Sequence, residues 1–125
     1  TLSYLAPEQT GRMNRGIDYR TDFYALGVTF YELLTGQLPF QSEDLMELVH
    51  CHIAKQPIPI HLIEPSLPPV LSAIVTKLMA KNAEERYQSA WGIKADLERC
   101  YRLLQSESLL THFSLGQKDI SEVFQ

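Results

Sequence analysis

Residues 22–36 read DFYALGVTFYELLTG, and Asp22 and Glu32 are the only charged residues among them. If this segment is helical, apolar side chains lie on every side of it, and such a helix belongs in the middle of a core. Gly36 is suited to end the helix, and Pro39 prevents it from continuing. The sequence therefore predicts a helix over residues 24–35 that needs other helices around it, and an all-α fold class.

Three further segments repeat apolar residues at helical spacing. They are residues 43–54, 68–81 and 89–105. Ser42 and Ser89 are suited to cap the first and the last of these helices, and Pro68 with Pro69 suits the first turn of the second. Residues 56–69 contain five prolines, which predicts an extended connection.

The composition is that of a globular protein, because 45% of the 125 residues are hydrophobic and 21% are charged. The net charge is −4 and the cations are not clustered, so a nucleic-acid partner is not expected. Residues 23–42 carry a single charge, but Gly27, Gly36 and Pro39 interrupt them. A membrane span needs about 20 apolar residues, so a buried helix is favoured and no membrane segment is predicted.

Cys51 and Cys100 are too few for a disulfide framework, which favours reduced thiols in a cytosolic protein. His50, Cys51 and His52 are adjacent, but residues two apart do not face each other on a helix, and no further ligands are spaced to join them. We therefore predict no metal site. The chain starts at Thr1 without a signal-like leader, and we expect a fragment or a trimmed chain.

Three motifs resemble, in the correct order, parts of a serine/threonine protein kinase domain of bacterial type. Residues 1–8, TLSYLAPE, resemble the end of the activation segment with its Ala-Pro-Glu motif. Residues 22–40 resemble the long central helix of the large lobe, and residues 81–87, KNAEERY, resemble the loop that carries an arginine before the last helix. Ala83 stands where many kinases have proline, which weakens the rigidity of that loop.

The resemblance implies a partial kinase-like large lobe, made of the helices after the Ala-Pro-Glu motif, without an N-terminal lobe. Residues 1–105 would form this partial domain, and residues 106–125 a C-terminal linker or exit segment. Residues 113–121, FSLGQKDIS, are similar to the segment that follows the kinase domain in large bacterial multidomain sensors. An ATPase-like module, sensor domains and a histidine kinase can follow there, so downstream sensor domains are possible partners.

The resemblance assigns the first four residues to the substrate side. Thr1 would support the catalytic loop by orienting groups around the acceptor alcohol, with an ordinary terminal threonine as the alternative. Thr1, Leu2, Ser3 and Tyr4 would form the loop that cups the substrate. For Tyr4, simple packing of the loop is an equal alternative.

Three further residues have structural roles in the family that this chain resembles. Glu8 and Arg86 would form a buried ion pair, with two independent surface charges as the alternative. Asp22 would accept N–H groups of the catalytic loop, or would cap its own helix. Because the catalytic loop is absent here, we expect Asp22 to be exposed or self-capping, beside uncovered apolar side chains.

The resemblance implies a parent protein that transfers the γ-phosphate of ATP to Ser or Thr of a protein substrate, with ATP and Mg²⁺ as its cofactors. The Gly-rich loop, the strand lysine, His-Arg-Asp and Asp-Phe-Gly are all missing from residues 1–125. We therefore expect this chain alone to bind no cofactor, to be inactive, and to need upstream kinase segments as partners. The alternative is a non-catalytic kinase remnant that serves as an interaction or linker module in the cytoplasm.

Overall fold

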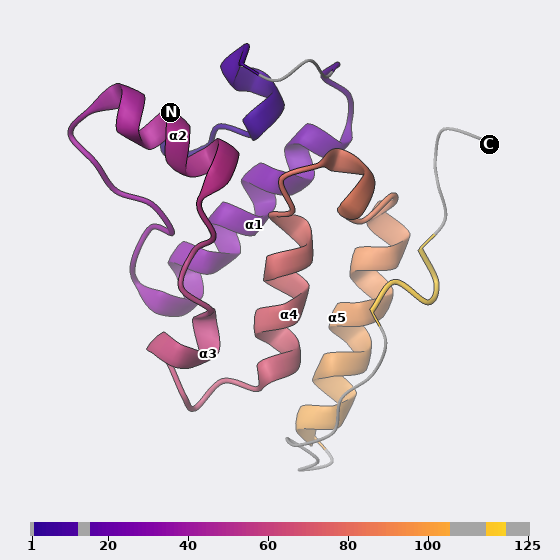
Figure 1. The fold of residues 1–125 in the computed structure, drawn as a ribbon. Coiled ribbons are helices and arrows are strands. Elements are labelled where there is room, and N and C mark those ends of the chain that lie inside the picture. Colours follow the sequence, from indigo (N-terminus) through magenta and orange to yellow (C-terminus); the bar gives the residue numbers. More distant parts are fainter. Residues whose placement is uncertain (1, 13–15, 106–114, 120–125) are drawn as a thin grey trace.

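The computed structural model describes residues 2–12, 16–105 and 115–119, and the secondary structure in these ranges is entirely helical (Figure 1). The helices are α1 (Arg20–Thr35), α2 (Leu45–Ala54), α3 (Ile60–Ile63), α4 (Pro69–Leu78) and α5 (Ala90–Gln105). Single turns of 3-10 helix form η1 (Leu2–Tyr4), η2 (Pro7–Thr10) and η3 (Ala83–Glu85). The predicted all-α fold class is confirmed.

Helix α4 holds the molecule together, because it packs against α1, α3 and α5. In Figure 1, α4 and α5 run side by side, and α1 crosses obliquely to them. Helix α2 contacts the N-terminal turns η1 and η2. The N-terminal turns are therefore supported by α1 and α2, and α5 by α4.

The core consists of two clusters of buried side chains that meet at α4. The first lies among α1, α2, α3 and α4 and comprises Ala6, Tyr24, Val28, Tyr31, Phe40, Leu48, Cys51, Ile60, Val75 and Met79. The second lies between α4 and α5 and comprises Val70, Ile74, Leu78, Tyr87, Ile93 and Cys100. Phe30 of α1 packs against both clusters. The apolar stripe predicted for the 68–81 segment is thus divided between two cores.

Gly27 allows α1 to cross closely over α4. A Cβ atom at this position would lie 2.6 Å from Cγ of Met79 and 2.9 Å from Cβ of Leu78. Neither distance is tolerable in a packed interior, so a larger residue would push the two helices apart. Glycine is therefore needed at position 27 for the packing of α1 on α4.

Helix α1 begins earlier than the predicted segment 24–35. Its first turn opens at Arg20, whose N–H donates to the Asp18 carboxylate at 2.8 Å. Tyr19 occupies the N-cap position, and Asp22 lies inside the first turn. The reading of Asp22 as the helix cap is therefore wrong.

The burial of α1 also differs from the prediction. Leu33 is 75% exposed, and Asp22 and Thr29 are exposed as well. Thr29 and Leu33 follow Asp22 by seven and eleven residues, so all three lie on the same face of the helix. Helix α5 packs mainly on α4, and α2 mainly on η1 and η2, so the expected ring of helices around α1 is incomplete. Within the described residues, one face of α1 is left uncovered.

Two local predictions between α1 and α4 need correction. The connection 56–69 is not wholly extended, because it contains α3, whose first residue Ile60 is 1% exposed and joins the first core cluster. Burial of Ile60 stabilises a turn that follows Pro59, where no backbone donor is needed. The cap of α2 is Asp44, whose carboxylate accepts from the Met46 N–H, and Ser42 instead binds the Asp44 N–H.

Other predicted boundaries are confirmed. Gly36 ends α1 with a φ of 74°, and its N–H donates to the Glu32 carbonyl at 2.8 Å. Pro68 and Pro69 begin α4, and the Ser89 hydroxyl accepts from the Gly92 N–H at 3.0 Å at the start of α5. Cys51 and Cys100 are buried free thiols. Among the described helices, none has the length and apolar character to span a membrane.

Residues 115–119 fold back onto the beginning of α5, and we call them the C-terminal clasp. The Asp119 carboxylate accepts from the Gln88 N–H at 2.6 Å and from the Ser89 hydroxyl at 2.7 Å. The Gly116 N–H donates to Asp96 at 2.8 Å. Part of the expected exit segment 106–125 is thus packed on the domain, and the boundary at residue 105 stays a prediction.

Candidate functional site

The centre of the candidate site is the ion pair between Glu8 of η2 and Arg86, which follows η3. The guanidinium Nη1 lies 2.6 Å from Oε2 of Glu8, and Nη2 lies 2.7 Å from Oε1. The residues are 6% and 1% exposed. Two parallel hydrogen bonds of this kind are the strongest contact that arginine makes with a carboxylate. The predicted ion pair is confirmed, although 78 positions separate its members.

The remaining polar atoms of the pair are also satisfied. Nε of Arg86 donates to the Ala80 carbonyl at 2.8 Å, and Nη1 donates to the Arg20 carbonyl at 3.0 Å. The Thr21 hydroxyl donates to Oε2 of Glu8 at 2.7 Å. A buried charge with unfilled hydrogen-bonding capacity would be costly, so these contacts allow the pair to lie in the interior.

The electrostatics of the site keep Glu8 ionised. Burial by itself raises the pKa of the Glu8 carboxyl, but the hydrogen bonds from Arg86 and Thr21 outweigh it and leave the pKa below its usual value. The pair therefore fixes two distant segments through a permanent charge.

Local sequence explains how Glu8 and Arg86 are each positioned by a short helical turn. Pro7 occupies the first position of η2, and Gly11 ends that turn with a φ of 74°. On the other side, the Arg86 N–H donates to the Ala83 carbonyl at 3.1 Å and closes η3. The turn thus forms with Ala83 where many kinases have proline.

A chain of polar contacts runs from the ion pair to the N-terminal turn. The guanidinium carbon of Arg86 lies 5.2 Å from the centre of the Tyr24 ring. The Tyr24 hydroxyl lies 2.8 Å from Nδ1 of His52, and Nε2 of His52 lies 3.0 Å from the Leu2 carbonyl. A carbonyl can only accept, so Nε2 carries the proton and Nδ1 of a neutral ring accepts from Tyr24.

His52 is a site residue that the sequence analysis did not recognise. Burial lowers the pKa of His52, the Leu2 carbonyl acts in the opposite sense, and the nearby Lys81 charge lowers it further. The available signal was its place among the apolar residues of the 43–54 segment, which predicts an inward-facing ring. Within the described residues, no group of three or more His, Cys, Asp or Glu side chains is arranged to hold a metal ion.

The predicted substrate loop is held at two of its residues. Leu2 is 46% exposed, while His52 binds its carbonyl. The Tyr4 hydroxyl donates to Glu32 at 2.5 Å, and this bond raises the pKa of Tyr4. A shallow cavity of about 410 Å³ is lined by Ser3, Leu38, Gln41, Ser42, Glu43 and Leu48. Thr1 lies outside the described residues.

Asp22 lies apart from this network, on the uncovered face of α1. Its residue is exposed, as is Leu33 three turns further along the same face. The expected exposure of Asp22 is therefore confirmed, and the self-capping alternative is not. Leu33 lies eleven residues away, about 16 Å along the helix at about 1.5 Å per residue, so it is not an apolar side chain beside Asp22.

A family model described as protein kinase domain matches residues 1–97. Hybrid signal transduction histidine kinase G of Dictyostelium discoideum is 53% identical over 98 residues, which are 78% of this chain and 3% of that protein. Serine/threonine-protein kinase PknB of Mycobacterium tuberculosis is 40% identical over 101 residues, 81% of this chain and 16% of that protein.

A further relative is serine/threonine-protein kinase PksC of Streptomyces coelicolor, with 34% identity over 106 residues, 85% of this chain and 18% of that protein. The chain spans less than a fifth of the length of each of these three relatives.

Proposed function

This chain belongs to the protein kinase domain family as a partial domain, and from that premise we propose that its parent protein transfers the γ-phosphate of ATP to Ser or Thr of protein substrates. The proposed contribution of this segment is to hold the substrate-facing loop at a fixed position. The observation that carries the proposal is the contact chain from Glu8 and Arg86 through Tyr24 and His52 to the Leu2 carbonyl.

Phosphoryl transfer depends mainly on positioning, so a scaffold that fixes the acceptor side would contribute directly to rate. The proposed roles are that Leu2, Ser3 and Tyr4 contact the substrate and that Thr1 orients the catalytic groups. His52 and Glu32 support them by holding the Leu2 carbonyl and the Tyr4 hydroxyl. The Leu2 side chain is left exposed to meet a peptide.

We propose that the uncovered face of α1 receives the upstream kinase segments. Asp22 would accept N–H groups from the catalytic loop, and Leu33 would be buried by the same contact. Both are exposed in the described structure, so both are available for such a partner. Burial of Leu33 would remove an apolar side chain from water, at a gain of about 1.5–3 kcal/mol.

ATP and Mg²⁺ are proposed for the parent only. The described residues contain no cluster that fits a metal ion and no Gly-rich phosphate loop, so no step is assigned to either cofactor here. ATP would supply the transferred phosphoryl group, with the metal neutralising its charge.

The setting of the parent is also a proposal. A hybrid signal transduction histidine kinase contains a segment 53% identical to this one, which supports a multidomain sensor with further modules downstream and a role in signal transduction. A cytoplasmic location is consistent with the buried free thiols Cys51 and Cys100.

Grafting tests the proposed catalytic role. The corresponding segment of PknB is replaced by residues 1–105 of this chain, which end with α5, and transfer of labelled phosphate to a generic protein substrate is measured. We expect activity that is lost on Arg86→Lys, because lysine cannot form the two parallel bonds to Glu8. The matched control is Arg12→Lys, the same substitution at an exposed arginine, and it should leave the activity unchanged.

A folded chimera without activity would reject the catalytic proposal and support the alternative of a non-catalytic interaction or linker module. Circular dichroism separates this outcome from misfolding, because the graft should retain its helical signal.

A further inference from the structure

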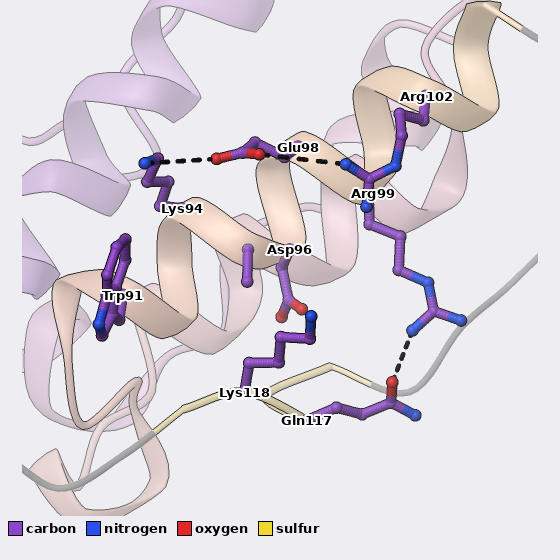
Figure 2. Close-up of a pocket in the computed structure, with 9 residues that line it drawn as sticks. Trp91, Lys94, Asp96, Glu98, Arg99, Arg102, Gln117 and Lys118 are labelled. Carbon is purple, nitrogen blue, oxygen red and sulfur yellow. Dashed lines mark hydrogen bonds and ion pairs between the residues drawn. The ribbon is translucent and has the colours of Figure 1, made fainter.

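A groove on the far side of α5 is not used by the proposed function. It is a cavity of about 560 Å³ between the outer face of α5 and the C-terminal clasp, and Figure 2 shows its lining side chains. This volume lies within the range of about 300–1,000 Å³ that is typical of binding pockets. It is lined by α5 and the C-terminal clasp, whereas the N-terminal turns contact α1 and α2.

One wall of the groove is the C-terminal clasp, and this wall is firmly attached. Asp119 binds the Gln88 N–H and the Ser89 hydroxyl, and the Gly116 N–H binds Asp96. Leu115 packs against the second core cluster. The clasp is thus held to the domain by hydrogen bonds at Gly116 and Asp119 and by apolar packing at Leu115.

Gly92 is required for this arrangement. A Cβ atom there would lie 2.3 Å from Oδ1 of Asp119 and 2.6 Å from its Cβ. Any other residue would displace Asp119, so the sequence of α5 makes room for the clasp.

The groove is positively charged within an acidic chain. Its lining includes Lys94, Arg99, Arg102 and Lys118, whereas the whole chain has a net charge of −4. Asp96 also lines it, but that residue is 3% exposed and its carboxylate already accepts from the Tyr87 hydroxyl at 2.7 Å and from the Gly116 N–H. An anionic partner would therefore meet cations first.

Glu98 is the one exposed acid in this lining, and it holds its cations loosely. It lies 3.7 Å from Lys94 and 4.0 Å from Arg102, and all three side chains are more than half exposed. Exposed pairs of this length contribute little, so an incoming carboxylate can replace Glu98 as the partner of either cation.

Trp91 gives the groove an apolar end. It is 63% exposed, and Nζ of Lys94 lies 4.9 Å from its ring centre. Tryptophan and arginine are both enriched among the interface residues that dominate binding energy, and this groove has both. Figure 2 shows Trp91 at one end of the groove and Arg102 at the other.

The spacing of these residues selects the kind of ligand. Trp91 and Arg102 are eleven residues apart on α5, a rise of about 16 Å at about 1.5 Å per residue. A single phosphate or carboxylate cannot reach both ends, whereas an extended peptide of about five residues can. Arg99 already donates to the Gln117 side chain of the clasp at 2.6 Å, whereas Lys94 and Arg102 share the exposed Glu98. We propose that this groove binds an acidic peptide segment of a partner protein, with one apolar side chain against Trp91 and carboxylates at Lys94 and Arg102. The proposal does not depend on phosphoryl transfer.

Trp91 is the only tryptophan of the chain, so its fluorescence reports directly on the groove. The probe is a capped peptide of about nine Glu, Asp and Leu residues, added to the 125-residue chain up to about 1 mM. We expect a saturable blue shift of the emission, because the leucine would shield the indole from water. The control peptide has lysine in place of every acid and should give no shift.

Charge variants give the expected fold-changes. Arg102→Ser should raise the Kd about threefold, because one charge contact is lost at an exposed surface. Glu98→Gln should lower the Kd about threefold, since an intramolecular competitor is removed. Lys55→Ser, an exposed cation at the end of α2, is the matched control and should leave the Kd unchanged.

The Glu98→Gln variant protects the test against misfolding, because an unfolded variant cannot gain affinity. The proposal is overturned if the emission does not respond to the acidic peptide, or if the lysine peptide binds as well. It is also overturned if inorganic phosphate at the same total charge reproduces the shift, because the groove would then bind a single anion.

Discussion

Two carboxylates attach the ends of this molecule to one short stretch, residues 86–89, and they do so in different ways. Glu8 binds the side chain of Arg86 through two short hydrogen bonds in the interior. Asp119 binds the backbone N–H of Gln88 and the hydroxyl of Ser89 at a partly buried position. We call them the N-terminal junction and the C-terminal junction.

The difference lies in what each junction requires of its partner. The N-terminal junction buries two opposite charges, so the loss of either leaves an uncompensated charge inside the protein. The C-terminal junction depends on a backbone donor, which any residue except proline offers, and on the empty space at Gly92. The N-terminal junction therefore requires two particular side chains, and breaking it should cost much of the folding free energy. The C-terminal junction requires mainly the space at Gly92, and breaking it should cost less.

The largest expected effect is at the N-terminal junction. Arg86→Met should lower the free energy of unfolding by about 3–5 kcal/mol, because Glu8 would stay buried without a partner. Urea denaturation followed by circular dichroism measures this loss.

A matched double variant isolates the cause. Glu8→Leu combined with Arg86→Met should restore most of the stability, since two apolar side chains of similar volume can replace a buried pair. A loss below about 1 kcal/mol for Arg86→Met alone would instead be the behaviour of independent surface charges.

The C-terminal junction should give a smaller effect. Asp119→Ala should cost about 1–2 kcal/mol, because the donors of Gln88 and Ser89 lose their acceptor. Gly92→Ala should cost a similar amount, because the added methyl group displaces the same carboxylate. Hydrogen exchange at the start of α5 should increase in both variants.

Combining these two substitutions tests whether Gly92 is needed only to leave space for the Asp119 side chain. In the Asp119→Ala background, Gly92→Ala should be neutral or should stabilise α5 by up to about 1 kcal/mol, since alanine is the better helix former. A cost that is the same in both backgrounds would show that Gly92 is needed for some reason other than the clasp.

The same contrast explains what the sequence could predict. The resemblance to the kinase family predicts the pairing of Glu8 with Arg86, because each lies in a recognisable motif, and the structure confirms their contact. Asp119 was assigned to an exit segment, because its partner is backbone and the space at Gly92 becomes apparent only when α5 and the clasp are placed together. Leu33 was expected to be buried because apolar periodicity does not show which segments cover a helix.

His52 was missed for a related reason. A histidine within an apolar stripe reads as core, and its hydrogen bonds to Tyr24 and to the Leu2 carbonyl depend on segments distant in sequence. Local periodicity predicts the four long helices, but not all of their ends: α1 begins at Arg20 and not at residue 24, α2 begins at Leu45 and not at residue 43, and α4 ends at Leu78 and not at residue 81. Helix α3 was not predicted, because the burial of Ile60 that stabilises it depends on segments distant in sequence.

Lys81 adds a titration to the N-terminal junction. Burial, first, and the nearby Arg86 charge lower the pKa of Lys81 from 10.5 to about 8, with Cys51 acting in the opposite sense. Between these two values the unfolded chain binds more protons than the folded one, so this group makes stability rise with pH across that window. The slope of unfolding free energy against pH should therefore be less positive in Lys81→Met than in the unchanged protein.

The difference between the two slopes is the quantity to measure for Lys81, because burial raises the pKa of Cys100 and makes stability fall with pH in both proteins. Equal slopes would show that the Lys81 amine is solvated, in spite of its contact with the Cys51 carbonyl at 3.1 Å.

The smallest effect concerns His52, and it extends the titration from the ion pair to the substrate-facing turn. Burial lowers the pKa of His52 below its usual 6.5, so acidification below that value adds protons to the unfolded chain first, and stability falls as pH falls. Glu8 does not confuse this window, because its pKa lies below 4.5 and its charge is retained. From about pH 7 to about pH 5.5, stability should fall more in the unchanged protein than in His52→Gln, whose amide can still donate to the Leu2 carbonyl. Nitrogen NMR should show the proton on Nε2 at neutral pH. An Nδ1 proton, or equal losses of stability in the two proteins, would break the contact chain at His52 and leave the N-terminal junction without a connection to Leu2.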